Sequence, residues 1–252
     1  MARGVTASVG SFGRELFHRL PERYQARVRR RLHPVRWGGL RSFEPLDTNL
    51  GFGRGTPVDR WYIDQFIARH QHEVRGRVLE VMAPTYAGNH ADGVVRVDVL
   101  DIDPMNPEAT IVADIADERS LPPGIFDCVI LTQTLQYVLD VHAALANVWQ
   151  SLAPSGVLLV SVPTISKGPT HWGAADRWRV LPAGLSTILQ RTCPSSECEV
   201  VGFGNLLVAM SALLGVAAEE LRSEELAKHD SDFVIITCAR VRKPLGNDRP
   251  DR

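Results

Sequence analysis

The stretch RVLEVMAPTYAGNH, residues 77–90, opens the part of the sequence that decides the fold. It begins with a short apolar run, which is typical of a buried strand. Similar runs follow at VVRVDVL (94–100), ATIVA (109–113), FDCVIL (126–131) and VLLVSV (157–162). Apolar residues recur at helical spacing over 141–152, between the last two runs. Apolar strands that alternate with helices are typical of a parallel sheet that is covered on both faces.

The same alternation extends on both sides of this stretch. Upstream, Thr56 is a candidate N-cap and Pro57 suits the first helical position. Asp59 can answer the cap three residues on, so we expect a helix over 57–74. Downstream, the sequence predicts helices at 182–192 and 205–221, the second capped by Asn205, and strands at 198–203 and 233–241.

Composition is that of an ordinary folded domain. The chain has 252 residues, of which 44% are hydrophobic and 23% are charged. A chain of this length buries enough surface to fold without disulfides or a structural metal. Its four cysteines form no CxxC pair, so we expect reduced, mostly buried thiols and no metal site.

No segment of the sequence is typical of membrane insertion or secretion. The longest apolar stretch, 206–218, is interrupted by Ser211 and Gly215. It falls short of the ~20 residues that span a bilayer. Arg3 is not followed by an apolar segment of the kind found in signal peptides. We therefore expect a cytoplasmic protein.

Charge is concentrated at the N-terminus. Residues 1–41 carry ten arginines and two glutamates, about +8, so the remainder is about −9 in a chain of net charge −1. Phe12, Leu16, Leu20 and Tyr24 recur every four residues, as in a short amphipathic helix. This arm either packs its apolar stripe on the body or contacts an anionic partner such as a lipid headgroup, a nucleotide-sugar or nucleic acid. We expect a basic arm over 1–55, one domain over 56–245 and a disordered tail over 246–252.

Several segments, in this order, resemble the motifs of class I S-adenosylmethionine-dependent methyltransferases. They are VLEVMAPTYAGNH, VVRVDVL, IVADIAD, IFDCVILTQTLQYV and LAPSGVLLVSVP. The resemblance covers residues 77–163, and its last two segments are the most specific. It implies an α/β fold with a Rossmann-like, seven-stranded, mostly parallel sheet, helices on both faces and an antiparallel last strand. It also implies S-adenosyl-L-methionine as the cofactor.

Acids that follow successive strands suit a nucleoside, because ligands of open α/β sheets bind at the carboxyl ends of strands. The resemblance implies the following contacts: Glu80 near the methionine amino group, Asp98 on the ribose, Asp114 near the adenine amine, Ile115 beside the ring, and Thr132 and Gln133 on the methionine part. Asp103 is the alternative to Asp98, which we favour because VVRVD fits the expected strand pattern better.

The turn after the first strand departs from the family pattern. The family has a glycine-rich loop there, because glycine lets the backbone approach the cofactor closely. Here Met82 and Pro84 occupy the region, and Gly88 is the nearest glycine. We expect Tyr86 to pack against the cofactor instead. The departure leaves open a catalytically degenerate protein that acts as a binding or partner subunit.

The loop after the fifth strand, TISKGPTHWGAADRWRV (164–180), is the candidate acceptor site. We expect His171 and Asp176 to be catalytic, as bases for a hydroxyl acceptor. Trp172, Arg177 and Trp178 are candidate substrate contacts, because rings with polar neighbours suit a sugar face. Alternatively the tryptophans cover the sheet end, Asp176 and Arg177 form a surface pair, and His142 is the base.

The C-terminal third resembles bacterial methyltransferases found with glycosyl-transfer and polysaccharide-assembly systems. This resemblance implies O-methylation of a hydroxyl on a sugar, glycoconjugate or other small molecule. No GxGxxG follows the first strand, which argues against an NAD-dependent oxidoreductase. We expect no specific nucleic-acid partner, and an oligomer is compatible with the sequence.

Overall fold

The computed structural model describes residues 41–89, 93–168 and 175–245, together with Pro21, Tyr24, Gln25 and Gly38. The chain divides into two units, Met1–Phe43 and Glu44–Arg252. Most of the predicted basic arm and the whole predicted tail lie outside the described residues. The second unit holds every element discussed below.

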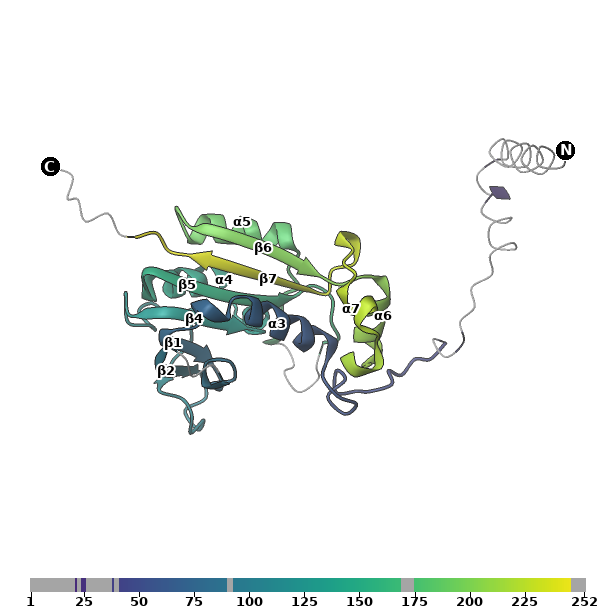
Figure 1. Ribbon diagram of the computed structural model, residues 1–252, viewed down its shortest axis with the longest axis horizontal. Coiled ribbons are helices and arrows are strands. Elements are labelled where there is room, and N and C mark those ends of the chain that lie inside the picture. Colours follow the sequence, from purple (N-terminus) through teal and green to yellow (C-terminus); the bar gives the residue numbers. More distant parts are fainter. Residues whose placement is uncertain are drawn as a thin grey trace. The chain divides into compact units, whose positions relative to one another are not determined.

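Seven strands form one sheet in the order β3-β2-β1-β4-β5-β7-β6 (Figure 1). They are β1 Gly76–Val81, β2 Val94–Asp101, β3 Ile111–Val112, β4 Phe126–Thr132, β5 Leu152–Pro163, β6 Glu197–Phe203 and β7 Ile236–Arg242. Only β7 pairs antiparallel, with β5 on one side and β6 on the other; the remaining pairs are parallel. The predicted fold class is confirmed. Strand order reverses between β1 and β4, where such sheets leave a crevice for ligands.

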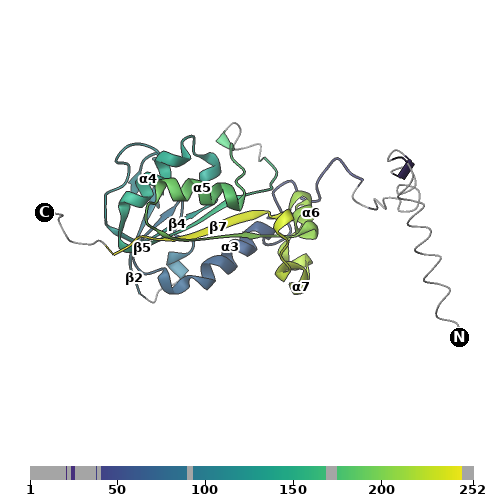
Figure 2. The same ribbon diagram turned by 90° about the horizontal axis from the view of Figure 1, so that it is seen from above.

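Helices cover both faces of the sheet. They are α3 Val58–Arg69, α4 Val141–Ser151, α5 Pro182–Thr192, α6 Leu206–Leu214 and α7 Ser223–Ala227, with 3-10 turns at Gln71–Glu73, Ala87–Asn89, Leu135–Tyr137, Ala218–Glu220 and Ser231–Phe233. Figure 2 shows α4 and α5 on one face and α3 on the other. The short helices α6 and α7 lie at one end of the sheet in both views.

Two apolar cores hold the layers together. On one face, Leu145 of α4 and Leu185 of α5 pack on β4 and β5. On the other, Tyr62 and Phe66 of α3 pack on the sheet together with Val208 of α6. Each of these side chains is at most 2% exposed, and burying one contributes about 1.5–3 kcal/mol. Burial from both sides explains why β4 and β5 read as unbroken apolar runs.

Two predicted helices differ from the structure at their ends. The helix expected over 57–74 ends at Arg69, and Thr56 does not cap it. The Thr56 hydroxyl instead donates to the Glu219 carboxylate at 2.7 Å, a partner that the local sequence does not reveal. This bond ties the start of α3 to the segment that follows α6.

The helix expected over 205–221 is shorter. Asn205 caps it as predicted, because its side-chain oxygen accepts from the Val208 N–H at 3.0 Å. It ends at Leu214, since Gly215 takes the left-handed conformation with φ 74°. A β-carbon at Gly215 would lie 2.4 Å from the Asp47 carbonyl oxygen, so glycine is required there.

Candidate active site

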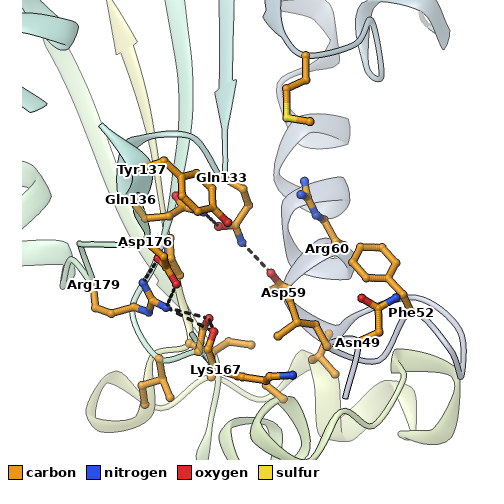
Figure 3. Close-up of a pocket in the computed structure, with 18 residues that line it drawn as sticks. Asn49, Phe52, Asp59, Arg60, Gln133, Gln136, Tyr137, Lys167, Asp176 and Arg179 are labelled. Atoms are coloured by element: carbon orange, nitrogen blue, oxygen red, sulfur yellow. Dashed lines mark hydrogen bonds and ion pairs between the residues drawn. The ribbon is translucent and has the colours of Figure 1, made fainter. Parts of the chain in front are cut away.

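A pocket of about 210 Å³ opens at the carboxyl ends of β1, β4 and β5, beside the reversal of strand order (Figure 3). Its walls come from segments that are far apart in the sequence. They are the loop 49–52, the first turn of α3, Met82 after β1, Gln133–Tyr137 after β4, Pro163–Lys167 after β5, the pair Asp176 and Arg179, Ala212 of α6, and Ile235 before β7. Most of the polar side chains in this lining are labelled in Figure 3.

Asp59 and Gln133 face each other across the pocket (Figure 3). The Gln133 Nε2 donates to the Asp59 carboxylate at 2.7 Å. Burial raises the pKa of Asp59 and outweighs the opposing effects of the Arg60 charge and the Gln133 hydrogen bond. A carboxylate with a raised pKa inside a polar pocket is suited to accept a proton.

Gln136 extends this pair into a chain of amides. Its Nε2 donates to the Gln133 Oε1 at 2.9 Å. Its own Oε1 is buried and has no hydrogen-bond partner among the described residues. Because a buried acceptor without a partner costs free energy, this oxygen suits an N–H or O–H group of a ligand.

The turn after β4 fixes Gln133 in place. Gln133 has φ 49°, an uncommon conformation for this residue type. Its backbone N–H donates to the carbonyl and to the hydroxyl of Ser161 on β5, at 3.1 and 3.2 Å. Thr132, the last residue of β4, is half-buried at the same edge. The structure therefore brings both predicted residues to the edge, and their contacts with the cofactor stay predictions.

At the opposite side of the pocket, Asp176 is already paired. Two nitrogens of the Arg179 guanidinium donate to its two carboxylate oxygens at 2.6 and 2.8 Å. The Asp176 side chain is 4% exposed. Both oxygens of this buried carboxylate are therefore already occupied by one guanidinium. This geometry does not support Asp176 as the base, and its partner is Arg179 rather than Arg177.

Arg177 and Trp178 do not line the pocket. The Arg177 guanidinium donates to the carbonyl of Tyr137, and the Trp178 indole N–H donates to the carbonyl of Val138 at 2.7 Å. Both side chains therefore cover the segment after β4. This favours the alternative for Trp178, whereas the alternative surface pair of Arg177 with Asp176 is not formed. His171 and Trp172 lie outside the described residues. His142 is exposed in the first turn of α4, away from the pocket lining.

Glu80 holds the loop after β1. Its side chain is buried, and its carboxylate accepts the backbone N–H groups of Tyr86 and Ala87, the shortest at 2.6 Å. Tyr86 is buried as well, and its hydroxyl donates to Asp64 of α3 at 3.2 Å. Tyr86 therefore packs into the core against α3 and is not placed to stack on a ligand in the pocket. Glu80 acts on the loop backbone in this structure.

Met82 takes the place expected for a glycine. Its φ is 68°, in the region that glycine favours, and its side chain is 53% exposed at the pocket. The Asn106 Nδ2 donates to the Met82 carbonyl at 2.7 Å and to the Asp101 carboxylate at 2.6 Å. The left-handed turn is thus kept without a glycine, and the loop after β2 braces it.

Asp98, which is expected to bind the ribose, does not lie at the end of β2; Asp101 does. The Asp98 side chain is 1% exposed and accepts from Arg77 at 2.6 Å and from Arg96 at 2.8 Å. Burial alone would raise the pKa of Asp98, but the hydrogen bonds and charges of the two arginines lower it. Asp101 is the last residue of β2 and is half-buried. The geometry thus does not support Asp98 at the ribose, and Asp101 is the acid at the strand end.

Asp114 and Ile115 follow β3 at the same edge. The Asp114 carboxylate accepts the Ala116 N–H at 2.9 Å, and the side chain is half-buried. Ile115 is 6% exposed and packs in the core, while its carbonyl accepts from Asn147 at 2.8 Å. Asp114 is available to a ligand at the edge, and contacts of either residue with adenine stay predictions.

Several residues of the site were not found by sequence reasoning. The local sequence of Asp59 indicates only helix capping, although its carboxylate accepts a hydrogen bond from Gln133 in the pocket. Gln136 belongs to the QTLQY segment, whose two glutamines three residues apart were the available signal. Asp101 is the acid that ends β2, and finding it required the true end of the strand.

Two general features of the described part of the chain bear on the site. No group of three or more His, Cys, Asp or Glu side chains within it is placed to hold a metal ion. None of its helices is both long enough and apolar enough to cross a membrane.

The profile of a family described as "Methyltransferase domain" matches residues 62–203. The chain belongs to this methyltransferase family. The matched range runs from α3 to the end of β6 and includes the turns after β1, β2 and β4. The cofactor of this methyltransferase domain is S-adenosyl-L-methionine. Among curated proteins, no sequence matches the chain.

Two of the solved structures that resemble the chain are methyltransferases. One is phosphoethanolamine N-methyltransferase 2 of Haemonchus contortus in complex with S-adenosyl-L-methionine, with a TM-score of 0.51 and 14% identity. The match covers 73% of this chain and 53% of that chain, so it spans about half of the longer enzyme. Another is the N-methyltransferase NodS of Bradyrhizobium japonicum with S-adenosyl-L-homocysteine, with a TM-score of 0.49, 16% identity, and coverage of 76% and 90%.

The residues at the carboxyl edge fit this cofactor. Asp101 and Asp114 offer carboxylate oxygens to hydroxyl and amino groups at the ends of β2 and β3. Neither Met82 nor Tyr86 closes the pocket, since Met82 lines it and Tyr86 packs into the core. The unpartnered Oε1 of Gln136 provides an acceptor inside it.

Proposed function

We propose that the methyltransferase transfers the methyl group of S-adenosyl-L-methionine to a hydroxyl group of a small polar acceptor, such as a sugar or glycoconjugate, with Asp59 as the proton acceptor. The observation that carries the proposal is the Asp59 carboxylate in the pocket. An amide is its hydrogen-bond donor across the pocket, and burial raises its pKa.

Asp59 would act directly on the acceptor. Bound in the pocket, the cofactor supplies an activated methyl group, so the protein must mainly orient the acceptor and remove its proton. The Gln133 amide holds the carboxylate in position. The raised pKa of Asp59 brings it closer to the range in which general bases work efficiently.

Gln136 and its neighbours would orient the acceptor. Gln136 lines the pocket, and its buried Oε1 would gain a hydrogen-bond donor if a hydroxyl of the acceptor reached it. Tyr137, Ser166 and Asn49 add further polar groups to the lining. Closely spaced donors and acceptors of this kind suit a polyhydroxylated molecule.

The cofactor would be held by groups nearer to β1 and β2. Asp101 and Asp114 suit its ribose and adenine, and the left-handed backbone of Met82 allows close approach to β1. Arg60 lines the pocket on the α3 side and offers a cation for the methionine carboxylate.

The test is the Asp59→Asn variant, assayed for transfer of a labelled methyl group to a panel of monosaccharides and glycosides. We expect turnover to fall by about 10²–10⁴-fold, because a positioned base contributes that much. Calorimetric affinity for S-adenosyl-L-homocysteine should change less than about twofold, since the base faces the acceptor. Asp64→Asn, on the same helix but outside the pocket lining, is the matched control.

A second candidate is a partner-binding subunit that no longer transfers methyl groups. It is favoured by Met82, because a side chain stands at φ 68° where the family uses glycine. Absence of S-adenosyl-L-homocysteine binding even at millimolar concentration would support this candidate and rule out the enzyme.

A further inference from the structure

The helix α6 is apolar on both sides. Its sequence LLVAMSALL contains no charged residue. One side is buried in the core through Val208, Ala209 and Ser211. The other side exposes four large side chains: Leu206 (51%), Leu207 (40%), Met210 (37%) and Leu213 (47%). We call these four residues the α6 ridge. A surface helix that exposes so many large apolar groups along one side usually meets a partner there.

The α6 ridge lies beside the pocket. Ala212 of the same helix lines the pocket, as does Phe52, which is 54% exposed. The Leu214 carbonyl at the end of α6 accepts the backbone N–H groups of Leu46 and Asp47, at 2.8 and 3.2 Å. Leu46 is itself 60% exposed, so apolar surface continues from α6 to the segment that leads to the pocket.

The basic arm joins the second unit at the same place. The boundary between the units falls after Phe43, directly before the segment that is bonded to the end of α6. Residues 1–41 contain ten arginines and two glutamates, a charge of about +8. A strongly basic segment therefore directly precedes, in the sequence, the segment that is bonded to the end of α6.

Three of the acids after α6 are already paired with arginines of the second unit. Glu220 pairs with Arg54, and Glu224 and Glu225 both pair with Arg222. A second copy of the chain on the ridge would bring two basic arms together, which like charges oppose. An anionic lipid surface satisfies both features, because interfacial proteins combine an apolar helix face with basic residues.

We propose that the α6 ridge docks the protein on an anionic phospholipid bilayer, with the basic arm supplying the electrostatic attraction. Docking by this ridge places the mouth of the pocket at the headgroup layer. Resting on the proposed function, this placement favours a lipid-linked glycoconjugate as the acceptor, whose sugar enters the pocket while its lipid part stays in the bilayer.

The test is co-sedimentation of the full chain with vesicles of phosphatidylcholine, alone or with about 30% phosphatidylglycerol. We expect clear binding only with phosphatidylglycerol present. Leu207→Ser combined with Met210→Ser should weaken this binding about tenfold, because two apolar side chains no longer enter the bilayer. Val95→Ser is the matched control, since Val95 is 85% exposed on β2.

A second set of variants tests the arm. Arg29→Gln, Arg30→Gln and Arg31→Gln together should weaken binding by about tenfold to hundredfold, as each basic residue near an anionic surface contributes about fivefold. Arg75→Gln, Arg119→Gln and Arg191→Gln change the net charge equally on exposed sites of the body. They should leave binding within about twofold of the wild type.

Three results would overturn the proposal. The first is that the wild type binds neither vesicle. The second is that the ridge variant binds as tightly as the wild type. The third is that light scattering shows a dimer for the wild type and a monomer for the ridge variant. Affinity for S-adenosyl-L-homocysteine, measured on the same variants without vesicles, reports on the proposed function separately. If the chain does not bind S-adenosyl-L-homocysteine, the proposed function fails, and the vesicle result still reports on membrane docking.

Discussion

The acids away from the pocket and the acids at the pocket edge have different partners. Glu73, after α3, accepts from Arg240 and Arg242, both at 2.6 Å. Asp98, within β2, is likewise held by two arginines. At the carboxyl edge, Asp59 and Asp101 accept from the side-chain amides of Gln133 and Asn106. Among these four acids the residue type is similar and the partner differs. Asp176, which also lines the pocket, belongs with the first two, because Arg179 is its partner.

This difference explains the opposite behaviour of the two groups. Burial alone would raise the pKa of Glu73, but its arginine partners overcome this effect and lower it to about 2. Burial raises the pKa of Asp59, whose side-chain hydrogen bond comes from the Gln133 amide. An acid paired with arginines is fixed as an anion and holds the fold together. Asp59, which is held by an amide and has a raised pKa, is suited to exchange a proton.

The largest effect on stability is expected for Glu73→Gln. It removes the buried carboxylate that pairs with Arg240 and Arg242, and Arg240 is only 11% exposed. We expect the free energy of unfolding to fall by about 3–5 kcal/mol in urea denaturation at neutral pH. Glu197→Gln is the control, because Glu197 pairs with the same Arg240 but is 72% exposed. It should cost less than about 1 kcal/mol.

The effect of Glu73 should also depend on pH with a defined sign. Its pKa is lower in the folded state than the ordinary 4.5, so its contribution is complete above that pH and is lost as the pH falls toward about 2. The difference in stability between the wild type and Glu73→Gln should therefore shrink between about pH 5 and pH 3. A constant difference would contradict the assignment.

Asp59→Asn should change the free energy of unfolding in the opposite direction to Glu73→Gln. The pKa of Asp59 is raised in the folded state, so the ionised carboxylate opposes folding as the pH rises above its ordinary value. Asparagine keeps an oxygen that accepts from Gln133 and removes the charge. We expect stability at neutral pH to rise by about 0.5–2 kcal/mol, a range typical of removing an unfavourable group. A marked loss in thermal denaturation would show that the charge is satisfied.

Asp101→Asn tests which acid of β2 serves the cofactor. We expect the affinity for S-adenosyl-L-homocysteine to fall about tenfold in calorimetry, since a hydrogen bond to a charged group contributes about 1.5 kcal/mol or more. Asp103→Asn is the control, because Asp103 is exposed two residues further on. An equal loss in both variants would point to the loop after β2 and not to the strand end.

The smallest effect is expected for Met82→Gly. Glycine relieves the cost of φ 68° but loses more entropy on folding, so stability should change by less than about 1 kcal/mol. Affinity for S-adenosyl-L-homocysteine should stay the same or rise slightly. A large loss of affinity would mean that the Met82 side chain itself contacts the cofactor.

The sheet could be predicted from the sequence because β1, β4 and β5 are buried on both faces. Such strands consist of apolar runs that are recognisable in the local sequence. Gly215 was also a readable stop signal within the helix that was expected to continue to 221. The site was harder to predict. The arginines that occupy Asp98 come from β1 and from β2 itself, and only the folded sheet shows that they leave Asp101 as the acid at the edge.

Asp59 illustrates the same limit. Its local pattern indicates helix capping, and its partner Gln133 is 74 residues away. The loop that carries His171 and Trp172 lies outside the described residues, so the predicted roles of these two stay untested. A site built from residues that are far apart in the sequence can be recognised only once the fold brings them together.

The bonds that join the segment before α3 to the segment after α6 have a consequence for folding. Arg54 reaches Glu220 across 166 residues, and Thr56 reaches Glu219 across 163. Contacts of such large sequence separation close long loops and form slowly. The side of the pocket formed by the segment before α3 and by α6 should thus be the last part to assemble on the ribosome. With few buried contacts, it should also be the first part to show amide exchange in the folded protein.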